Sequence, residues 1–227
     1  MKTMRLLLIR HGQTPSNVEG ILDADYPGPG LTALGRAQAQ AVPGALQHET
    51  IQGLHVSRLL RTHETAAPLA AALEMSPRLT EGLEEIVAGD FEMRRDEAAV
   101  EAYQQNQARW SGGELDGSLP GGETGHDFLA RYTRALRHIA GLYAEDATVA
   151  VVSHGAAIRV FASVVGELGA ATRHDRPLFN TGMVTLTGHP DQGWTLEDWV
   201  SEPIGGGHLL GSIEHDITAD QDAEAAV

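Results

Sequence analysis

The chain has 227 residues, no cysteine, 42% hydrophobic residues and a formal net charge of −15 at pH 7. This composition is that of a globular protein, and it excludes disulfides, thiolate metal sites and cysteine nucleophiles. A surface this acidic repels nucleic acid and anionic membranes, and it repels phosphorylated metabolites as well unless arginines are gathered in one place.

The sequence also predicts where the protein works. No apolar run is long enough to span a membrane, and the first residues lack the pattern of a signal peptide. We therefore expect a cytoplasmic protein with no nucleic-acid or membrane partner. The sequence does not indicate the oligomeric state.

The first elements are predicted from apolar runs and from the glycine, proline and capping residues between them. Residues 6–9 are continuously apolar, which predicts a buried strand. The glycines and prolines of residues 26–30 predict a loop, and Thr32 is a candidate cap for the helix that follows. Pro43 is expected to kink or end that helix.

Later elements follow the same logic. Apolar stripes predict helices around residues 66–73, 128–143 and 158–165. Short apolar runs predict strands at residues 54–57 and 149–152 and a hairpin formed by residues 183–187 and 195–199. Residues 82–125 mix glycine, charge and glutamine, and we expect part helix and part long loop there. Strands alternating with helices predict an α/β fold, a three-layer αβα sandwich whose mostly parallel central sheet has helices on both faces.

Two predicted strands end in similar motifs, Arg10-His11-Gly12 and Ser153-His154-Gly155. Ligand sites in open α/β sheets form at the carboxyl ends of the strands, so both histidines are expected in one crevice. A single histidine there would more simply be a core or capping residue. Two His-Gly pairs, with Arg10 beside one of them, favour a functional site.

An arginine also marks a predicted helix start. Arg61 follows the strand at residues 54–57, where a helix N-terminus offers free N–H groups and the side chain adds a bidentate fork for phosphate. We expect the nearby Arg58 to be a solvated surface residue. The glutamates of residues 83–92 would, taken alone, belong to a solvated face as well.

Together, these motifs resemble the histidine phosphatase superfamily, also called the phosphoglycerate mutase-like family. The resemblance covers about residues 4–200 and rests on RHGQTPSN, SRLLRTHETA, LEEIVAGDFE and VVSHG, in this order. Residues 31–39 and 120–124 match further family patterns. The resemblance implies a metal-independent phosphomonoesterase that acts on a small phosphorylated substrate through a phosphohistidine, without a cofactor.

The resemblance also implies roles for individual residues. His11 matches the nucleophile that becomes phosphohistidine. Arg10 and Arg61 match the arginines that clamp phosphate. His154 matches the second histidine, which binds the phosphoryl group, and Asn17 matches an asparagine that touches phosphate.

Glu85 matches the proton donor, with Glu84 and Glu92 as less favoured alternatives. Glu85 would donate a proton to the leaving oxygen and then act as a base in the hydrolysis of the phosphohistidine. The expected domain spans residues 1–202, with a lid or specificity segment at about residues 86–125. A Gly-rich and then acidic tail is expected at residues 203–227.

The main alternative is a cofactor-dependent phosphoglycerate mutase. Such mutases hold a bisphosphorylated intermediate with extra basic residues after the acid. Residues 102–122 offer one arginine, Arg109, together with Glu114 and Asp116. The pair Arg94-Arg95 is expected on a helix surface, so the sequence favours the phosphatase branch.

Two rivals of other classes carry less weight. The motif Asp23-Ala24-Asp25 is a DxD, as in metal-dependent haloacid dehalogenase phosphatases, but Tyr26-Pro27 follow it where that motif needs Thr or Val. A non-catalytic phosphate-ligand or protein-binding module on the same fold would be expected to lack the nucleophile or an arginine. No metal-binding pattern is found among the 11 histidines.

Overall fold

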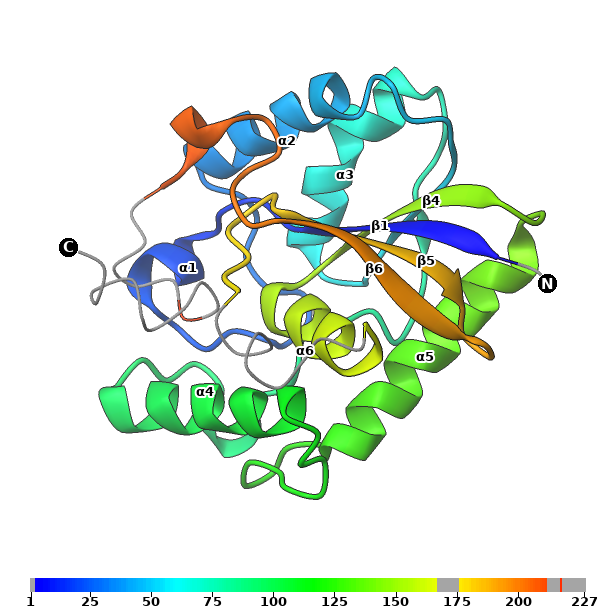
Figure 1. The fold of residues 1–227 in the computed structure, drawn as a ribbon. Coiled ribbons are helices and arrows are strands. Elements are labelled where there is room, and N and C mark those ends of the chain that lie inside the picture. Colours follow the sequence, from blue (N-terminus) through cyan, green and yellow to red (C-terminus); the bar gives the residue numbers. More distant parts are fainter. Residues whose placement is uncertain (1–2, 167–175, 212–216, 218–227) are drawn as a thin grey trace.

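A six-stranded sheet lies at the centre of the computed structural model, which describes residues 3–166, 176–211 and 217 (Figure 1). The strand order is β3-β2-β4-β1-β5-β6. The strands are β1 (Met4–Arg10), β2 (Ile51–Val56), β3 (Arg78–Leu79), β4 (Ala147–Ser153), β5 (Met183–His189) and β6 (Gly193–Val200). The first four strands pair in parallel, whereas β5 and β6 are antiparallel, as the predicted hairpin requires.

Helices cover both faces of this sheet (Figure 1). They are α1 (Pro15–Glu19), α2 (Ala33–Ala45), α3 (Leu60–Ala72), α4 (Glu97–Ser111), α5 (Gly125–Leu142) and α6 (Gly155–Val165), with 3-10 turns at Gly89–Phe91 and Gly207–Leu209. No helix in the described ranges combines the length and the apolar character needed to cross a membrane.

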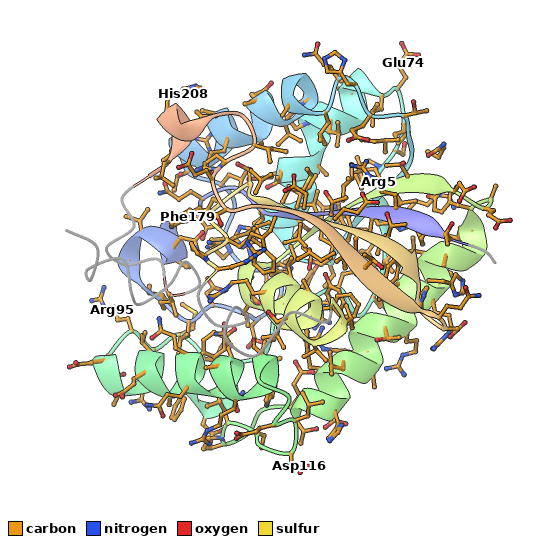
Figure 2. All side chains as sticks on the ribbon, viewed as in Figure 1. Arg5, Glu74, Arg95, Asp116, Phe179 and His208 are labelled. Atoms are coloured by element: carbon orange, nitrogen blue, oxygen red, sulfur yellow. The ribbon has the colours of Figure 1, made fainter. Side chains whose placement is uncertain are left out.

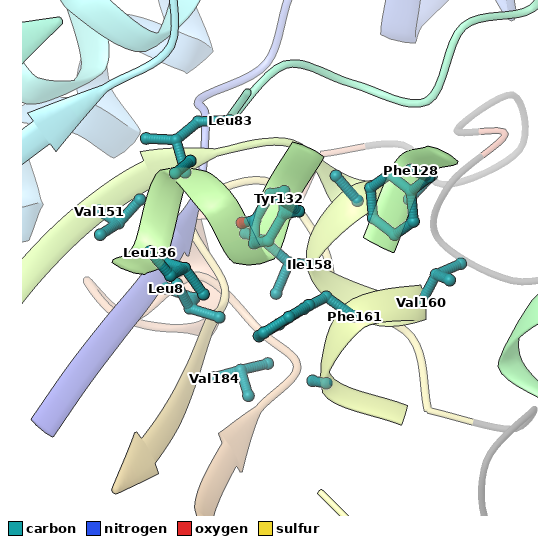
Figure 3. Close-up of a cluster of buried hydrophobic side chains, with 14 of the residues drawn as sticks. Leu8, Leu83, Phe128, Tyr132, Leu136, Val151, Ile158, Val160, Phe161 and Val184 are labelled. Carbon is teal, nitrogen blue, oxygen red and sulfur yellow. The ribbon is translucent and has the colours of Figure 1, made fainter. Parts of the chain in front are cut away.

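Alternation along β1 divides the core in two. Leu7 and Ile9 face a cluster that includes residues of α2 and α3. Leu6 and Leu8 face the larger cluster. There the ring of Tyr132 on α5 packs against that of Phe161 on α6, with a centroid distance of 4.9 Å (Figure 3). Two packed faces on one buried sheet confirm the predicted three-layer αβα sandwich.

Local signals explain where several elements begin and end. Thr32 caps α2, since its Oγ1 accepts a hydrogen bond from the N–H of Gly35 at 3.0 Å. Pro43 lies inside the last turn of α2 and does not end the helix, which continues to Ala45. In residues 82–125, the predicted mixture of helix and loop is confirmed by α4 and the long segments on either side of it.

The described part of the C-terminal segment packs on this domain. The carbonyl of Leu209 accepts a hydrogen bond from Nε2 of Gln38 at 2.9 Å, and the carbonyl of Ile217 accepts one from Nε2 of Gln104 at 3.0 Å. The rest of the predicted acidic tail, residues 212–216 and 218–227, lies outside the described residues.

A buried histidine links the sheet to the end of α5. His55 on β2 is fully buried, and its ring nitrogens bond the hydroxyls of Thr80 at 2.8 Å and Tyr143 at 2.9 Å. Burial, followed by the charges of Arg78 and His138, lowers the pKa of His55 to about 4. The folded protein therefore holds this ring neutral well into the acidic range.

We expect His55 to make the protein less stable by up to about 3 kcal/mol as the pH falls from 6.5 to about 4. In this window the unfolded histidine binds a proton that the folded one does not, so the stabilisation is complete only above about pH 6.5. Urea denaturation at a series of pH values measures the slope. The slope of the unfolding free energy against pH reports how many more protons the unfolded state binds. His55→Gln should reduce that number by up to one between pH 4 and 6.5, and an unchanged slope would contradict the expectation.

Candidate active site

The two histidine motifs meet at one edge of the sheet. Strands β1 and β4 are parallel neighbours in which Arg10 pairs with Ser153, so the residues that follow them emerge side by side. The N–H of His11 donates to the carbonyl of Ser153 at 3.0 Å. The rings of His11 and His154 lie 5.3 Å apart, centroid to centroid, in an edge-to-face arrangement.

The ring of His11 is held in the form that a nucleophile needs. Its Nδ1 lies 2.8 Å from the carbonyl of Gly12, which can only accept, so Nδ1 carries the hydrogen and Nε2 keeps its lone pair. Burial, then the charges of Arg61 and Arg10, lower the pKa of His11 well below its usual range. The imidazole is therefore neutral, and it lies between cations that attract phosphate.

His154 takes the opposite tautomer. Its Nδ1 accepts a hydrogen bond from Nε of Arg61 at 3.3 Å, which leaves Nε2–H to donate to Oγ of Ser57 at 2.8 Å. Burial, then Arg61 and His11, lower the pKa of His154 well below its usual range. This histidine thus orients Arg61 and contacts His11 at the same time.

Both predicted arginines are buried beneath this edge. Arg10 has no exposed surface, and its Nη1 donates to the carbonyl of Leu178 at 2.7 Å. Nη2 of Arg61 donates to the carbonyl of Asp23 at 3.0 Å, while its Nη1 is buried with no hydrogen-bond partner among the described residues. Gly28 has φ = 66°, which strains any other residue, and a Cβ there would lie 2.6 Å from that Nη1 and crowd it.

Glu85 lies at the N-terminus of α6. Its Oε2 accepts from the N–H of Ala156 at 3.1 Å, and its Oε1 accepts from the N–H groups of Ala157 at 2.8 Å and Ile86 at 2.9 Å. A helix N-terminus is a favourable place for a carboxylate because its N–H groups have no partner within the helix. These bonds fix both oxygens of Glu85.

A pocket of about 480 Å³, partly open to solvent, connects these groups. Five of the six predicted site residues line it, namely Arg10, His11, Asn17, Arg61 and Glu85. His154 is not among the described residues of its lining, although its ring lies 5.3 Å from that of His11, centroid to centroid. Glu85 is the one glutamate among the described lining residues, which separates it from the two alternatives.

Those two glutamates have other partners. Glu84 accepts a hydrogen bond from the N–H of Gly82 at 2.7 Å. Glu92 binds the N–H groups of Ala24 and, at 3.1 Å, of Asp25. It thereby holds the loop that contains the DxD motif.

Asn17 is oriented toward the pocket by its own hydrogen bonds. Its Oδ1 accepts from the backbone N–H of Thr14 at 3.0 Å and from Nδ2 of Asn180 at 3.2 Å. No described residue accepts from Nδ2 of Asn17, so this donor remains for a ligand.

Several supporting residues could not be found by sequence reasoning. Asn180 also donates to the carbonyl of His11 at 3.1 Å, and Oγ1 of Thr65 accepts from the N–H of Gly12 at 2.9 Å. Tyr103 lines the pocket, and burial raises its pKa well above the usual value. Asn180 and Tyr103 lie far from the motifs in sequence, whereas Thr65 lies within the motif of residues 57–66 but has no side-chain role that the sequence indicates.

Comparison with known proteins identifies the family of the chain. The model of the histidine phosphatase superfamily (branch 1) matches residues 6–202. The PE-PGRS family protein PE_PGRS11 of Mycobacterium tuberculosis is 34% identical over 226 residues, which are 92% of this chain and 38% of that protein. The chain thus spans well under half the length of that relative.

Other relatives match over most of both chains. The adenosylcobalamin/alpha-ribazole phosphatase of Escherichia coli is 31% identical over 176 residues, covering 76% of this chain and 85% of that protein. A probable phosphoglycerate mutase of Salmonella choleraesuis is 28% identical over 202 residues, covering 89% and 93%. Among solved structures, a mycobacterial glucosyl-3-phosphoglycerate phosphatase superposes with a TM-score of 0.71 at 26% identity, covering 88% of this chain and 100% of that one.

Proposed function

The chain belongs to the histidine phosphatase superfamily, and on that basis we propose that it is a phosphoric monoester hydrolase acting on small phosphorylated metabolites. The observation that carries the proposal is the state of His11, a neutral ring with its Nε2 lone pair free beside two buried arginines. Phosphatases among the relatives support the same reaction.

In the first step, Nε2 of His11 attacks phosphorus in line with the leaving oxygen. The N–P bond forms as the P–O ester bond breaks, and the bonding electron pair leaves with the alcohol oxygen. Glu85 gives that oxygen its proton; we assign the proton to Oε2, because Oε1 already accepts two N–H groups. Arg10, Arg61 and Nδ2 of Asn17 hold the equatorial oxygens.

In the second step, water attacks the phosphohistidine. Glu85, now ionised, takes a proton from that water as the new P–O bond forms. The N–P electron pair returns to Nε2 of His11, and inorganic phosphate leaves. His154 supports both steps by holding Nε of Arg61 in place.

We propose that no metal takes part. The arginines supply the positive charge that a metal would otherwise bring to the transferring group. No group of three potential metal ligands is found among the described residues. The cytoplasmic location expected from the sequence stays a prediction.

The positions of the arginines in the predicted lid segment, about residues 86–125, favour hydrolysis over mutase activity. Arg109 is exposed in the last turn of α4, away from the pocket lining. Arg94 pairs with Asp96 at 2.7 Å, and Arg95 lies 3.5 Å from Glu19. Both are exposed and precede α4, so they do not lie on a helix as expected. Figure 2 shows Arg95 at the surface. No extra cation from this segment reaches the described part of the pocket to hold a second phosphate.

One assay separates hydrolysis from mutase activity and tests the role of metal. We expect phosphate release from a panel of monoesters in the presence of EDTA, and only slow phosphate release from 3-phosphoglycerate. Addition of 2,3-bisphosphoglycerate should not change this result. Stoichiometric conversion of 3-phosphoglycerate to 2-phosphoglycerate with little free phosphate would overturn the phosphatase assignment in favour of the mutase suggested by one group of relatives.

A further inference from the structure

Residues 82–86, the loop that carries Glu85, are bound by side chains along their whole length. Each of the five backbone carbonyls accepts a hydrogen bond from a side chain. The donors are Nη1 of Arg131 to Gly82 (3.0 Å) and to Glu84 (2.9 Å), Nη2 of Arg131 to Glu85 (2.9 Å), Oγ of Ser153 to Leu83 (2.8 Å) and the hydroxyl of Tyr103 to Ile86 (2.8 Å). One residue, Arg131, therefore makes three of these five bonds.

Arg131 is itself held rigidly on α5. Its Nε and Nη2 donate to the two carboxylate oxygens of Glu123, at 2.8 and 2.6 Å, in a bidentate pair. Its guanidinium lies 5.1 Å from the ring centroid of Phe128. Glu123 belongs to the segment at residues 120–124 that matches a family pattern and has no part in the mechanism above.

We propose that Arg131, held by Glu123, is a positioning residue that places the carboxyl group of Glu85 for proton transfer. This inference rests on the proposed function, in which Glu85 is the acid. Neither Arg131 nor Glu123 is among the described residues that line the pocket, so they act through Glu85 and not on the substrate.

The loop needs this support because it has no regular structure of its own. Residues 82–86 belong to no helix or strand, and Gly82 has φ = 94°, a conformation that side chains rarely adopt. The side chain of Glu85 is fixed at its oxygens by α6, and its backbone is fixed by Arg131 from α5. The two helices together define where the proton is delivered.

Lysine cannot replace this arrangement. The guanidinium reaches three carbonyls and one carboxylate because its nitrogens are spread over a rigid plane. A single ammonium nitrogen at the end of a flexible stem keeps the charge but cannot bond all four groups. Arg131→Lys should therefore leave the fold intact while loosening the loop.

The test uses the dependence of the rate on the leaving group. An alkyl phosphate needs a proton on its leaving oxygen, whereas p-nitrophenolate leaves without one. Values of kcat/KM are measured for both esters in wild type, Glu85→Gln, Arg131→Lys, Glu123→Gln and the double variant Glu85→Gln with Arg131→Lys. Thermal unfolding and circular dichroism check that each variant is folded.

We expect Glu85→Gln to lose about 10²-fold more activity on the alkyl ester than on p-nitrophenyl phosphate. Arg131→Lys should lose about 10-fold more on the alkyl ester, because small misplacements of a catalytic group are costly, and Glu123→Gln should follow it to a smaller extent. In the double variant, Arg131→Lys should add no further selective loss, since the acid it positions is already absent.

Two controls distinguish positioning from loss of stability. Arg137→Lys changes an arginine of the same helix that pairs on the surface with Asp191 at 2.7 Å, and it should leave both rates unchanged. Ile139→Val weakens the buried face of α5 and should lower stability without altering the ratio of the two rates.

The possible failures are separable. If Glu85→Gln lowers both rates equally, Glu85 is not the acid, and the mechanism and this inference are both overturned. If Glu85→Gln is selective but folded Arg131→Lys lowers both rates equally or neither, the mechanism stands and the positioning role is wrong. A selective loss in Arg131→Lys that persists in the double variant would also refute action through Glu85.

Discussion

Replacing His11 with alanine should reduce kcat by about 10⁵-fold or more on every phosphomonoester, because it removes the proposed nucleophile of the covalent step. Nδ1 of His11 makes one hydrogen bond, to the carbonyl of Gly12, and the surrounding β1 and β4 pair through seven residues each, so the variant should remain folded. Turnover with a 32P-labelled ester and stopped-flow detection of the burst provide the measurement.

The covalent intermediate gives this prediction a second readout. Wild-type protein quenched during turnover should carry a label that is stable in base and lost in acid, as expected for a phosphoramidate. His11→Ala should carry none. His48→Ala, at an exposed position after α2 and away from the pocket lining, is the matched control and should keep both label and rate. Near-normal turnover in His11→Ala would exclude the covalent route.

The histidines could be predicted from sequence because their signal is local. One apolar strand runs directly into Arg10 and His11, and another runs into His154. Within a few residues, each pattern indicates a buried strand and a polar group at its end. Parallel pairing of β1 with β4 then brings the two ends together. The same holds for Arg61, which follows β2 by only a few positions.

Glu85, the proposed acid, is harder to recognise from sequence than the histidines, and the reason lies in the hydrogen bonds of its loop. The backbone carbonyls of residues 82–86 accept from side chains of α4, α5 and β4 and form no regular helix or strand ladder, so their sequence shows no helical or strand periodicity. The family spacing therefore favours Glu85 but leaves Glu84 and Glu92 as alternatives. Position in the fold separates them: Glu84 bonds to Gly82, and Glu92 binds the loop that contains Ala24.

Contacts across long stretches of chain were beyond prediction for a different reason. Asn180 bonds to the carbonyl of His11 across 169 positions, and Arg131 bonds to Glu85 across 46. Nothing in the residues around Asn180 or Arg131 marks them, because their roles depend on which distant backbone group the fold brings to them. Such second layers of a site become visible only when the packing is known.

Arg61→Ala should lower kcat/KM by about 10³-fold and should also move the acid limb of the pH profile to higher pH. The loss of rate follows from removal of a buried fork that holds the transferring group. The pH effect follows from charge, since Arg61 is the next largest cause after burial of the lowered pKa of His11. Without this cation the pKa of His11 rises, and at acidic pH a larger fraction of the ring is protonated on Nε2, where it cannot attack.

Arg61→Lys separates these two effects. It keeps the positive charge, so the acid limb should stay where it is in wild type, but it loses the fork and the bond from Nε to His154, so the rate at the optimum should still fall. Arg58→Ala is the matched control: Arg58 is exposed, its Nε lies 3.8 Å from Oε1 of Glu84, and it does not line the pocket, so rate and pH profile should both be unchanged. If Arg61→Ala loses rate with no shift of the acid limb, the charge of Arg61 does not keep His11 neutral, and its role is limited to holding the phosphoryl group.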